Sequence, residues 1–199
     1  MRPAARAIKA IVFDVDGTLT LPSLIDFKRM RERLDCPTGI DILEHCGTDP
    51  LRHAIVVEEE LAAETVLMPD VHILQGWLSA RPHLKTALLT RNNSAALART
   101  VSLLGPSWRF DAALSREWGG KNKPHEEPLL YLSQKFSCHP ADVIMVGDSL
   151  DDVDCAKRAG AIGVLIGNPT TDRERALAAA THRVDTLTAL TDLLDSFGA

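Results

Sequence analysis

Five short runs of apolar residues recur along the chain. They occupy residues 11–13, 86–89, 112–114, 143–146 and 162–166. Nearly continuous apolar runs of this length are typical of parallel strands, because helices cover both faces of a parallel sheet and bury every side chain. The pattern therefore predicts five buried β-strands.

The segments between the last four runs repeat their apolar residues with helical spacing. Leu97, Val101 and Leu104 precede Gly105, and a similar series ends at Gly160. Glycine just after the last apolar position is a common helix stop. Strands alternating with helices predict the α/β class, with a Rossmann-like parallel sheet and crossover helices on both of its faces.

Residues 21–67 interrupt this alternation with helix signals and no strand signal. Phe27, Met30 and Leu34 have helical spacing, and Asp49 followed by Pro50 predicts a capped helix start. We interpret this stretch as a small α-helical cap inserted after the first strand. The predicted catalytic core is then formed by residues 1–20 and 68–199, and the cap by residues 21–67.

Composition and charge exclude several classes of partner. The 199 residues include 22 basic and 27 acidic side chains, a formal net charge of -5, so no long-range attraction to nucleic acid or to an anionic membrane is expected. No run approaches the roughly 20 apolar residues of a membrane-spanning helix. We therefore expect a cytoplasmic protein that binds neither nucleic acid nor membrane. The sequence does not predict an oligomeric state.

Two carboxylates lie where the first predicted strand meets a glycine. Asp14 and Asp16 are one residue apart, and Gly17 follows. A carboxylate attacks phosphorus only if its repulsion from the phosphate is offset, which a divalent cation does. Asp16 then has the chemistry to protonate the leaving alcohol and to activate water. Gly17 allows backbone N–H groups to approach the phosphate.

A second acidic cluster follows the fourth predicted strand. Asp148, Asp151 and Asp152 lie within five residues, next to Gly147 and Ser149. Carboxylate oxygens are the ligands that Mg²⁺ prefers, so Asp148 is the best candidate ligand and Asp152 a partner acting nearby or through water. The alternative is that these acids only cap the helix that follows.

Two further side chains lie just beyond strand ends. Thr90 closes the second predicted strand, before Arg91 and Asn92, and Lys123 follows the third. Each alone is a weak signal, since such residues are usually a helix cap or a surface charge. Together with the carboxylates they fall beyond the carboxyl ends of separate strands, where open α/β sheets bind ligands. We predict that Gly17, Thr90, Arg91, Asn92 and Lys123 bind phosphate. Lys121 is the alternative lysine.

This set of residues, in this order, resembles the haloacid dehalogenase superfamily of phosphohydrolases that use an aspartate nucleophile. The resemblance implies that Asp14 is the nucleophile, Asp16 the general acid and base, and that Thr90 and Lys123 hold the transferring phosphoryl group. It implies further that Mg²⁺ is held by the Asp14 carboxylate, the Asp16 main-chain carbonyl and Asp148, with Asp152 nearby. One detail departs from the family pattern, since Lys123–Pro124 is not followed by a second proline until Pro128.

The expected activity is Mg²⁺-dependent hydrolysis of a small phosphorylated metabolite through an aspartyl phosphate. The chain is similar to phosphoglycolate phosphatases but has a shorter cap, so the resemblance does not fix the substrate. A phosphomutase or phosphotransferase of the same family stays open, whereas Asp16 argues against a dehalogenase. From a different class, a phosphoryl-accepting receiver module or an inactive binding module is the alternative.

The first cap helix carries four basic residues, Lys28, Arg29, Arg31 and Arg33. One hypothesis is that they attract an anionic substrate. Glu32 and Asp35 lie among them, and such mixed charge is more typical of a solvated helix face.

Overall fold

Strands and helices alternate through most of the chain in the computed structural model, which describes residues 7–22, 25–169 and 172–198. Residues 1–6, 23–24, 170–171 and 199, which belong to the predicted core and cap, lie outside the described residues. The strands are β1 (Ala10–Phe13), β2 (Lys85–Leu89), β3 (Ala112–Leu114), β4 (Val143–Gly147), β5 (Ile162–Ile166) and β6 (His182–Val184). They form one parallel sheet in the order β3-β2-β1-β4-β5-β6.

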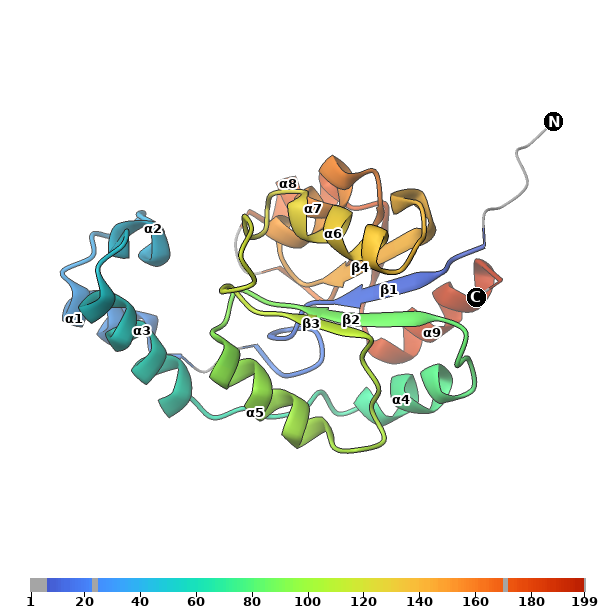
Figure 1. Ribbon diagram of the computed structural model, residues 1–199, viewed down its shortest axis with the longest axis horizontal. Helices are drawn as coiled ribbons and strands as arrows, with labels where there is room; N and C mark the ends of the chain where they lie inside the picture. The colour runs from blue at the N-terminus through green and yellow to red at the C-terminus, as the bar shows by residue number, and fades with distance from the viewer. Residues whose placement is uncertain (1–6, 23–24, 170–171, 199) are drawn as a thin grey trace.

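Helices cover both faces of this sheet (Figure 1). One face carries α4 (Val71–Ser79), α5 (Ser94–Leu104) and α9 (Leu187–Ser196), and the other carries α6 (Glu127–Lys135), α7 (Leu150–Ala159) and α8 (Arg173–Ala179). A short 3₁₀ turn, Pro140–Asp142, leads into β4. The predicted Rossmann-like α/β fold and its five strands are confirmed. The edge strand β6 was not predicted.

The strand sequences are continuous apolar runs because a hydrophobic core lies on each face of the sheet. Ile11 and Phe13 pack toward α4, α5 and α9, whereas Ala10 and Val12 pack toward α6 and α7. All four side chains are fully buried. Successive residues of a strand point to opposite faces, so a sheet covered on both sides needs an apolar residue at every position.

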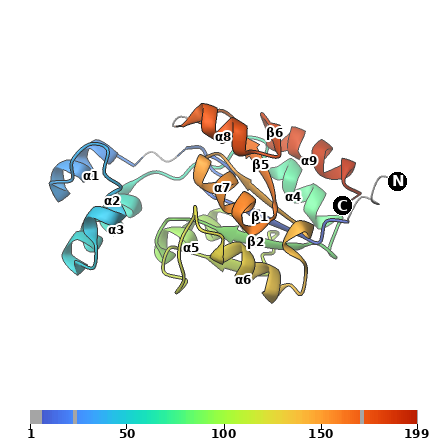
Figure 2. The ribbon, with the colours of Figure 1, turned by 90° about the horizontal axis from the view of Figure 1, so that it is seen from above.

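In the described part of the segment between β1 and α4 the chain forms three helices, α1 (Phe27–Leu34), α2 (Ile42–Cys46) and α3 (Pro50–Ala62). They enclose a small core of their own, which includes Met30, Leu34 and Val56. Asp49 caps α3 as its sequence predicts, accepting hydrogen bonds from the backbone N–H groups of Leu51 and Arg52. In Figures 1 and 2 these helices stand apart from the sheet, beyond the carboxyl end of β1.

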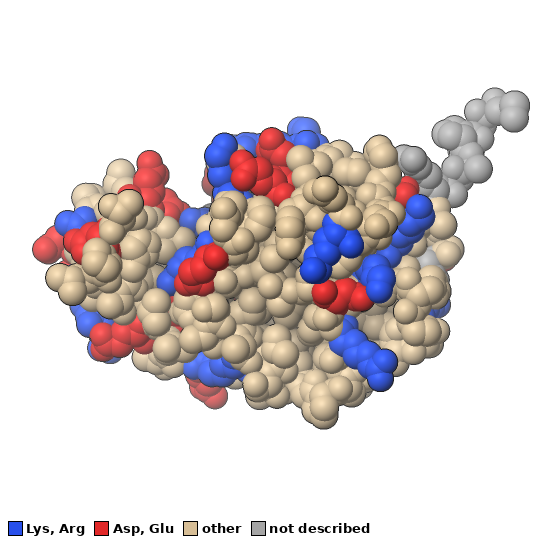
Figure 3. Space-filling view, viewed as in Figure 1, with Lys and Arg blue, Asp and Glu red and all other residues tan. Residues whose placement is uncertain are grey.

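Basic and acidic side chains are interspersed on the face drawn in Figure 3, over the cap and the core alike. Among the described helices, none has the length and apolar character that crossing a bilayer requires.

Candidate active site

Strand register places the end of β1 at the centre of the site. Phe13 pairs with Leu88 of β2 and with Val146 of β4. Asp14 follows at once, and its backbone N–H donates to Val146 O at 2.8 Å. Its side chain therefore emerges between the loops that leave β2 and β4, at the carboxyl edge where open α/β sheets bind ligands.

Lys123 lies between two of the predicted carboxylates. Its Nζ donates to Asp14 Oδ1 at 2.5 Å and to Asp152 Oδ1 at 2.6 Å, and all three side chains are buried. Burial alone would lower the pKa of Lys123, but the two adjacent carboxylates raise it above its ordinary value, so the ammonium stays charged. Lys121 instead pairs with Glu127 at 3.3 Å on the surface. The geometry thus favours Lys123 over Lys121 as the site lysine.

Asp152 belongs both to the site and to the start of α7. Its Oδ2 accepts from the Ser149 backbone N–H at 3.0 Å and from the Ser149 hydroxyl at 2.5 Å, which completes a capping box. Its other oxygen, Oδ1, accepts from Lys123. The capping alternative therefore holds for Asp152, and the same contacts fix its carboxylate in the site.

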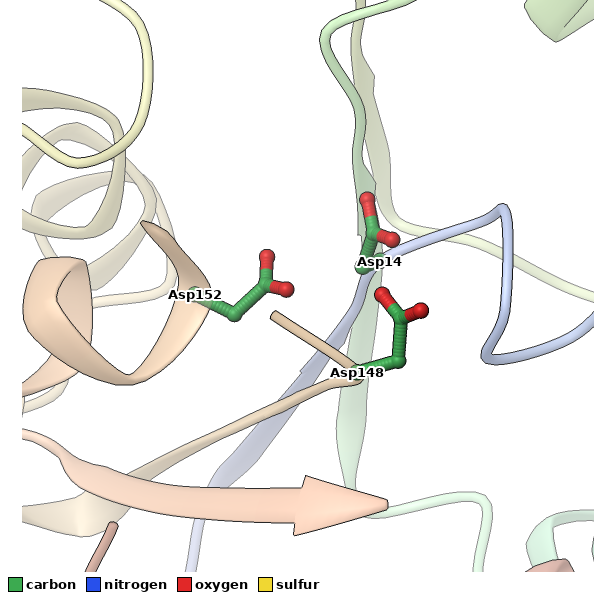
Figure 4. A group of neighbouring side chains, drawn as sticks. All are labelled: Asp14, Asp148 and Asp152. Atoms are coloured by element: carbon green, nitrogen blue, oxygen red, sulfur yellow. The ribbon is translucent and has the colours of Figure 1, made fainter. Parts of the chain in front are cut away.

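Asp14, Asp148 and Asp152 form a group that suits a divalent cation. One carboxylate oxygen of each lies within 4.8 Å of the others, and Figure 4 shows the three side chains converging on a shared space. Three carboxylates and one ammonium leave two negative charges, which Mg²⁺ would balance. Because Lys123 and Ser149 already engage both oxygens of Asp152, Asp14 and Asp148 are the better ligands.

The pKa values of this group reflect the cost of burying carboxylates together. Burial raises the pKa of Asp14 well above its ordinary range, although Lys123 opposes the shift. Burial, with the nearby Asp152 carboxylate, raises the pKa of Asp148 to about 7. Each ionised carboxylate destabilises the ionised form of its neighbours. A bound cation would relieve this repulsion, so the raised pKa values are consistent with a metal site.

Two glycines make room for these carboxylates. Gly17 has φ +75°, and a Cβ atom built on it would lie 2.0 Å from Asp148 Oδ2. A Cβ atom on Gly147 would lie 2.2 Å from Asp152 Cγ. Glycine is therefore favoured at Gly17 by the positive φ, and a Cβ atom would fit there only if the Asp148 carboxylate moved.

Asp16 is oriented separately from the acidic group. Its Oδ2 accepts from Asn92 Nδ2 at 2.6 Å and its Oδ1 from the Thr20 hydroxyl at 3.2 Å. The buried Thr90 hydroxyl accepts from the Asn92 backbone N–H at 3.1 Å. The loop after β2 thus positions both Thr90 and the second aspartate, a role for Asn92 that its sequence position did not reveal.

Arg91 joins the cap to the core. It donates to Asp41, the N-cap residue of α2, at 2.6 Å and to Asp151 of α7 at 2.8 Å. A second link is buried, where Glu60 of α3 pairs with Arg116 and accepts from Asn93. In this arrangement the side chains of Arg91 and Asn92 donate to carboxylates, so phosphate binding by these two residues stays a prediction.

The basic side chains of α1 make contacts within the cap. Arg33 pairs with Glu58 at 2.7 Å and Glu59 at 2.6 Å, and Arg29 pairs with Glu59 at 3.2 Å. Arg31 donates to the carbonyl oxygens of Pro37 and Ile40. These contacts hold the cap helices together and favour the structural interpretation of this helix.

Two cavities flank the sheet at opposite ends. One, of about 300 Å³, lies between the cap and the loop after β2 and includes Asp16, Arg91 and Asn92 in its wall. The other, of about 560 Å³, lies around Thr86 and Trp108 near the amino ends of the strands and has no site carboxylate in its wall. Of these two cavities, only the smaller one adjoins the site residues described above.

Several residues of the site have no signal in the sequence alone. Ser149 is an exception, because Ser149 and Asp152 match the capping-box pattern in the sequence. The contacts of Asp41, Glu60 and Arg116 could not be predicted. Each joins segments far apart along the chain, and no periodicity or spacing relates them.

Comparison with known proteins identifies the family of this chain. The family model described as haloacid dehalogenase-like hydrolase matches residues 40–166. A haloacid dehalogenase-like hydrolase domain-containing protein of Arabidopsis thaliana is 34% identical over 184 residues, which cover 82% of this chain and 72% of that protein. A phosphoglycolate phosphatase of Chromobacterium violaceum is 29% identical over 190 residues, covering 80% and 85% respectively.

Among solved structures, a hydrolase from Pseudomonas syringae superposes with a TM-score of 0.75 at 17% identity, covering 94% of this chain and 98% of that one. At this identity the match supports the fold alone. The family model spans more than half of the chain, and the Arabidopsis relative is aligned over most of it. The chain belongs to the haloacid dehalogenase-like hydrolase family.

Proposed function

We propose that this hydrolase releases phosphate from a small phosphate monoester, with Asp14 as the nucleophile. The observation that carries the proposal is the convergence of Asp14, Asp148 and Asp152, two of which, Asp14 and Asp152, contact the Lys123 ammonium. One lysine among three carboxylates leaves an excess of negative charge that a magnesium ion would balance. The phosphatase names of some relatives are consistent with the proposed activity.

In the first step a carboxylate oxygen of Asp14 attacks phosphorus and the ester oxygen leaves. Lys123 fixes the orientation of Asp14 through Oδ1, and the Thr90 hydroxyl, which accepts from Asn92, still has its own proton to donate to a phosphoryl oxygen. Magnesium, held by Asp14 and Asp148 with the Asp16 carbonyl, would offset the repulsion between the nucleophile and the phosphoryl group.

Asp16 would protonate the leaving oxygen and then take a proton from the water that hydrolyses the aspartyl phosphate. Asn92 and Thr20 occupy its two oxygens. The bond to Thr20, at 3.2 Å, is the longer, so we expect it to be exchanged for one to the substrate. Hydrolysis then regenerates the Asp14 carboxylate and releases inorganic phosphate.

Incubation with p-nitrophenyl phosphate tests the proposal. We expect steady release of phosphate in the presence of Mg²⁺, its loss on addition of EDTA, and its loss in Asp14→Asn. A single phosphorylation event without turnover would instead support a receiver module, and turnover that EDTA leaves unchanged would contradict the metal requirement.

A further inference from the structure

A cavity of about 300 Å³ lies between cap and core, next to the proposed site. Asp16 lies in its wall, and the leaving oxygen must come within hydrogen-bond reach of Asp16 to receive a proton. The group attached to that oxygen is therefore directed into this cavity. Its volume is at the small end of the range for small-molecule sites.

The charged side chains in the cavity wall already have partners within the protein. Arg91 is paired with Asp41 and Asp151, and Arg31 donates to the Pro37 and Ile40 carbonyl oxygens at 2.9 Å. Glu60 is paired with Arg116 and Asn93. A charged leaving group that engaged Arg91 or Glu60 would have to compete with these ion pairs.

The formal charge of the cavity wall also disfavours an anionic leaving group. It contains two guanidinium groups, Arg31 and Arg91, against three carboxylates, Asp16, Asp41 and Glu60, so the formal sum is one negative charge. A carboxylate or a second phosphate on the leaving group would meet no net attraction in this space.

Apart from Asn92, the uncharged part of the wall is apolar and comes from the cap. Six side chains form it: Ile25, Phe27, Met30, Ile42, Leu43 and Val56. Met30, Ile42 and Val56 are buried in the cap core and give this side a fixed shape, whereas Phe27 is 51% exposed. An exposed phenyl ring in the wall of the cavity that also contains Asp16 is a surface that an apolar ligand would cover.

We propose that the cap pocket selects phosphate monoesters of apolar alcohols, alkyl or aryl, over sugar phosphates and over short phosphorylated acids such as phosphoglycolate. This inference rests on the proposed phosphatase activity. The phosphate is held by the charged residues at the strand ends, and the apolar body of the alcohol packs against Phe27 and the neighbouring cap side chains.

A series of alkyl phosphates tests the inference, because ethyl, butyl and hexyl phosphate have leaving groups of closely similar reactivity. We expect kcat/KM to rise about fourfold for each methylene that the pocket buries, the equivalent of about 0.8 kcal/mol. Phosphoglycolate and glucose 6-phosphate should be hydrolysed more slowly than hexyl phosphate.

Phe27→Ala tests whether the Phe27 ring binds the alkyl chain. It should lower kcat/KM for hexyl phosphate about tenfold and leave ethyl phosphate within about twofold, since only the longer chain reaches the ring. Leu51→Ala is the matched control, because Leu51 is a cap residue that is 77% exposed and outside the pocket wall. It should leave the whole series unchanged.

The possible failures are distinguishable. A flat alkyl series, or phosphoglycolate hydrolysed faster than hexyl phosphate, would overturn the apolar pocket while leaving the phosphatase activity intact. No phosphate release from any compound, p-nitrophenyl phosphate included, would overturn the proposed function and this inference with it.

Discussion

Lys123 Nζ lies 2.5 Å from Asp14 Oδ1, although 109 residues separate the two along the chain. The contact exists because β1 lies inside the sheet and the chain returns from β3, two strands away, to the same edge. A buried ammonium between Asp14 and Asp152 neutralises part of their repulsion and holds the proposed nucleophile in one orientation.

Replacing Lys123 by methionine should remove that neutralisation while keeping the volume. We expect the free energy of unfolding in EDTA to fall by about 3 kcal/mol, because two buried carboxylates lose their counter-ion. We expect kcat to fall by at least about a hundredfold. Lys121→Met, which changes an exposed lysine two residues away, should affect neither. Urea denaturation and turnover of p-nitrophenyl phosphate measure both, and equal behaviour of the two variants would refute the role of Lys123.

Gly17→Ala should damage the metal site specifically. The added methyl group would lie 2.0 Å from Asp148 Oδ2, so the carboxylate must move. Gly160→Ala is the control, because Gly160 has a similar φ of +74° but no atom within 4 Å of the built Cβ. Both variants should lose about 1 kcal/mol of stability from backbone strain. Only Gly17→Ala should require a higher Mg²⁺ concentration for half-maximal activity, and matching titrations would contradict the prediction.

The raised pKa of Asp148 predicts how stability depends on pH in the absence of metal. In the folded protein this pKa is about 7, above the value of about 3.9 for an unfolded chain, so between these values the folded state binds more protons. The contribution of Asp148 to stability in EDTA should therefore fall as the pH rises from about 4 to about 7 and then level off.

Comparison with Asp148→Asn isolates the contribution of that one carboxyl group from the other titrating groups. The stability difference, variant minus wild type, should increase across the same pH window, as measured by urea denaturation at intervals of half a pH unit. A difference that stays constant from pH 4 to pH 7 would show that Asp148 does not titrate there.

The buried pair of Glu60 and Arg116 predicts a stability effect at the junction of cap and core. Both side chains are only 7% exposed, so Glu60→Ala leaves the buried Arg116 guanidinium with the longer ion pair to Glu117, at 3.6 Å, and should cost about 3 kcal/mol. Glu58→Ala breaks an ion pair in which Glu58 is 63% exposed and should cost less than about 1 kcal/mol. Thermal unfolding of the two variants compares them, and similar losses would show that burial does not govern this contact.

The sheet could be predicted from the sequence because strands buried on both faces are apolar at nearly every position. Runs such as residues 143–146 are apolar at every position, and α7 has both a capping pattern at Ser149 and a stop at Gly160. In contrast, β6 is three residues long with an exposed arginine at its centre and pairs only with β5. Such an edge strand depends on its neighbour, and its own residues carry no strand signal.

The predicted site residues divide in the same way. Asp14, Asp148 and Lys123 lie together because strand ends of a parallel sheet share one edge, which sequence order alone can predict. The orientation of Asp16 by Asn92 and the pairing of Arg91 with the cap could not be predicted, because they depend on how a loop and a separate helical unit meet. The same is true of the cavity between them.

We propose that Asp14 carries the phosphoryl group during turnover. The most direct test is rapid acid quenching of the enzyme during hydrolysis of p-nitrophenyl phosphate, followed by mass spectrometry of the peptides, with Asp16→Asn used to slow hydrolysis of the adduct. We predict phosphorylation on Asp14 in both proteins and more of it in the variant. A phosphoryl group on any other residue, or turnover with no adduct in either protein, would contradict the account.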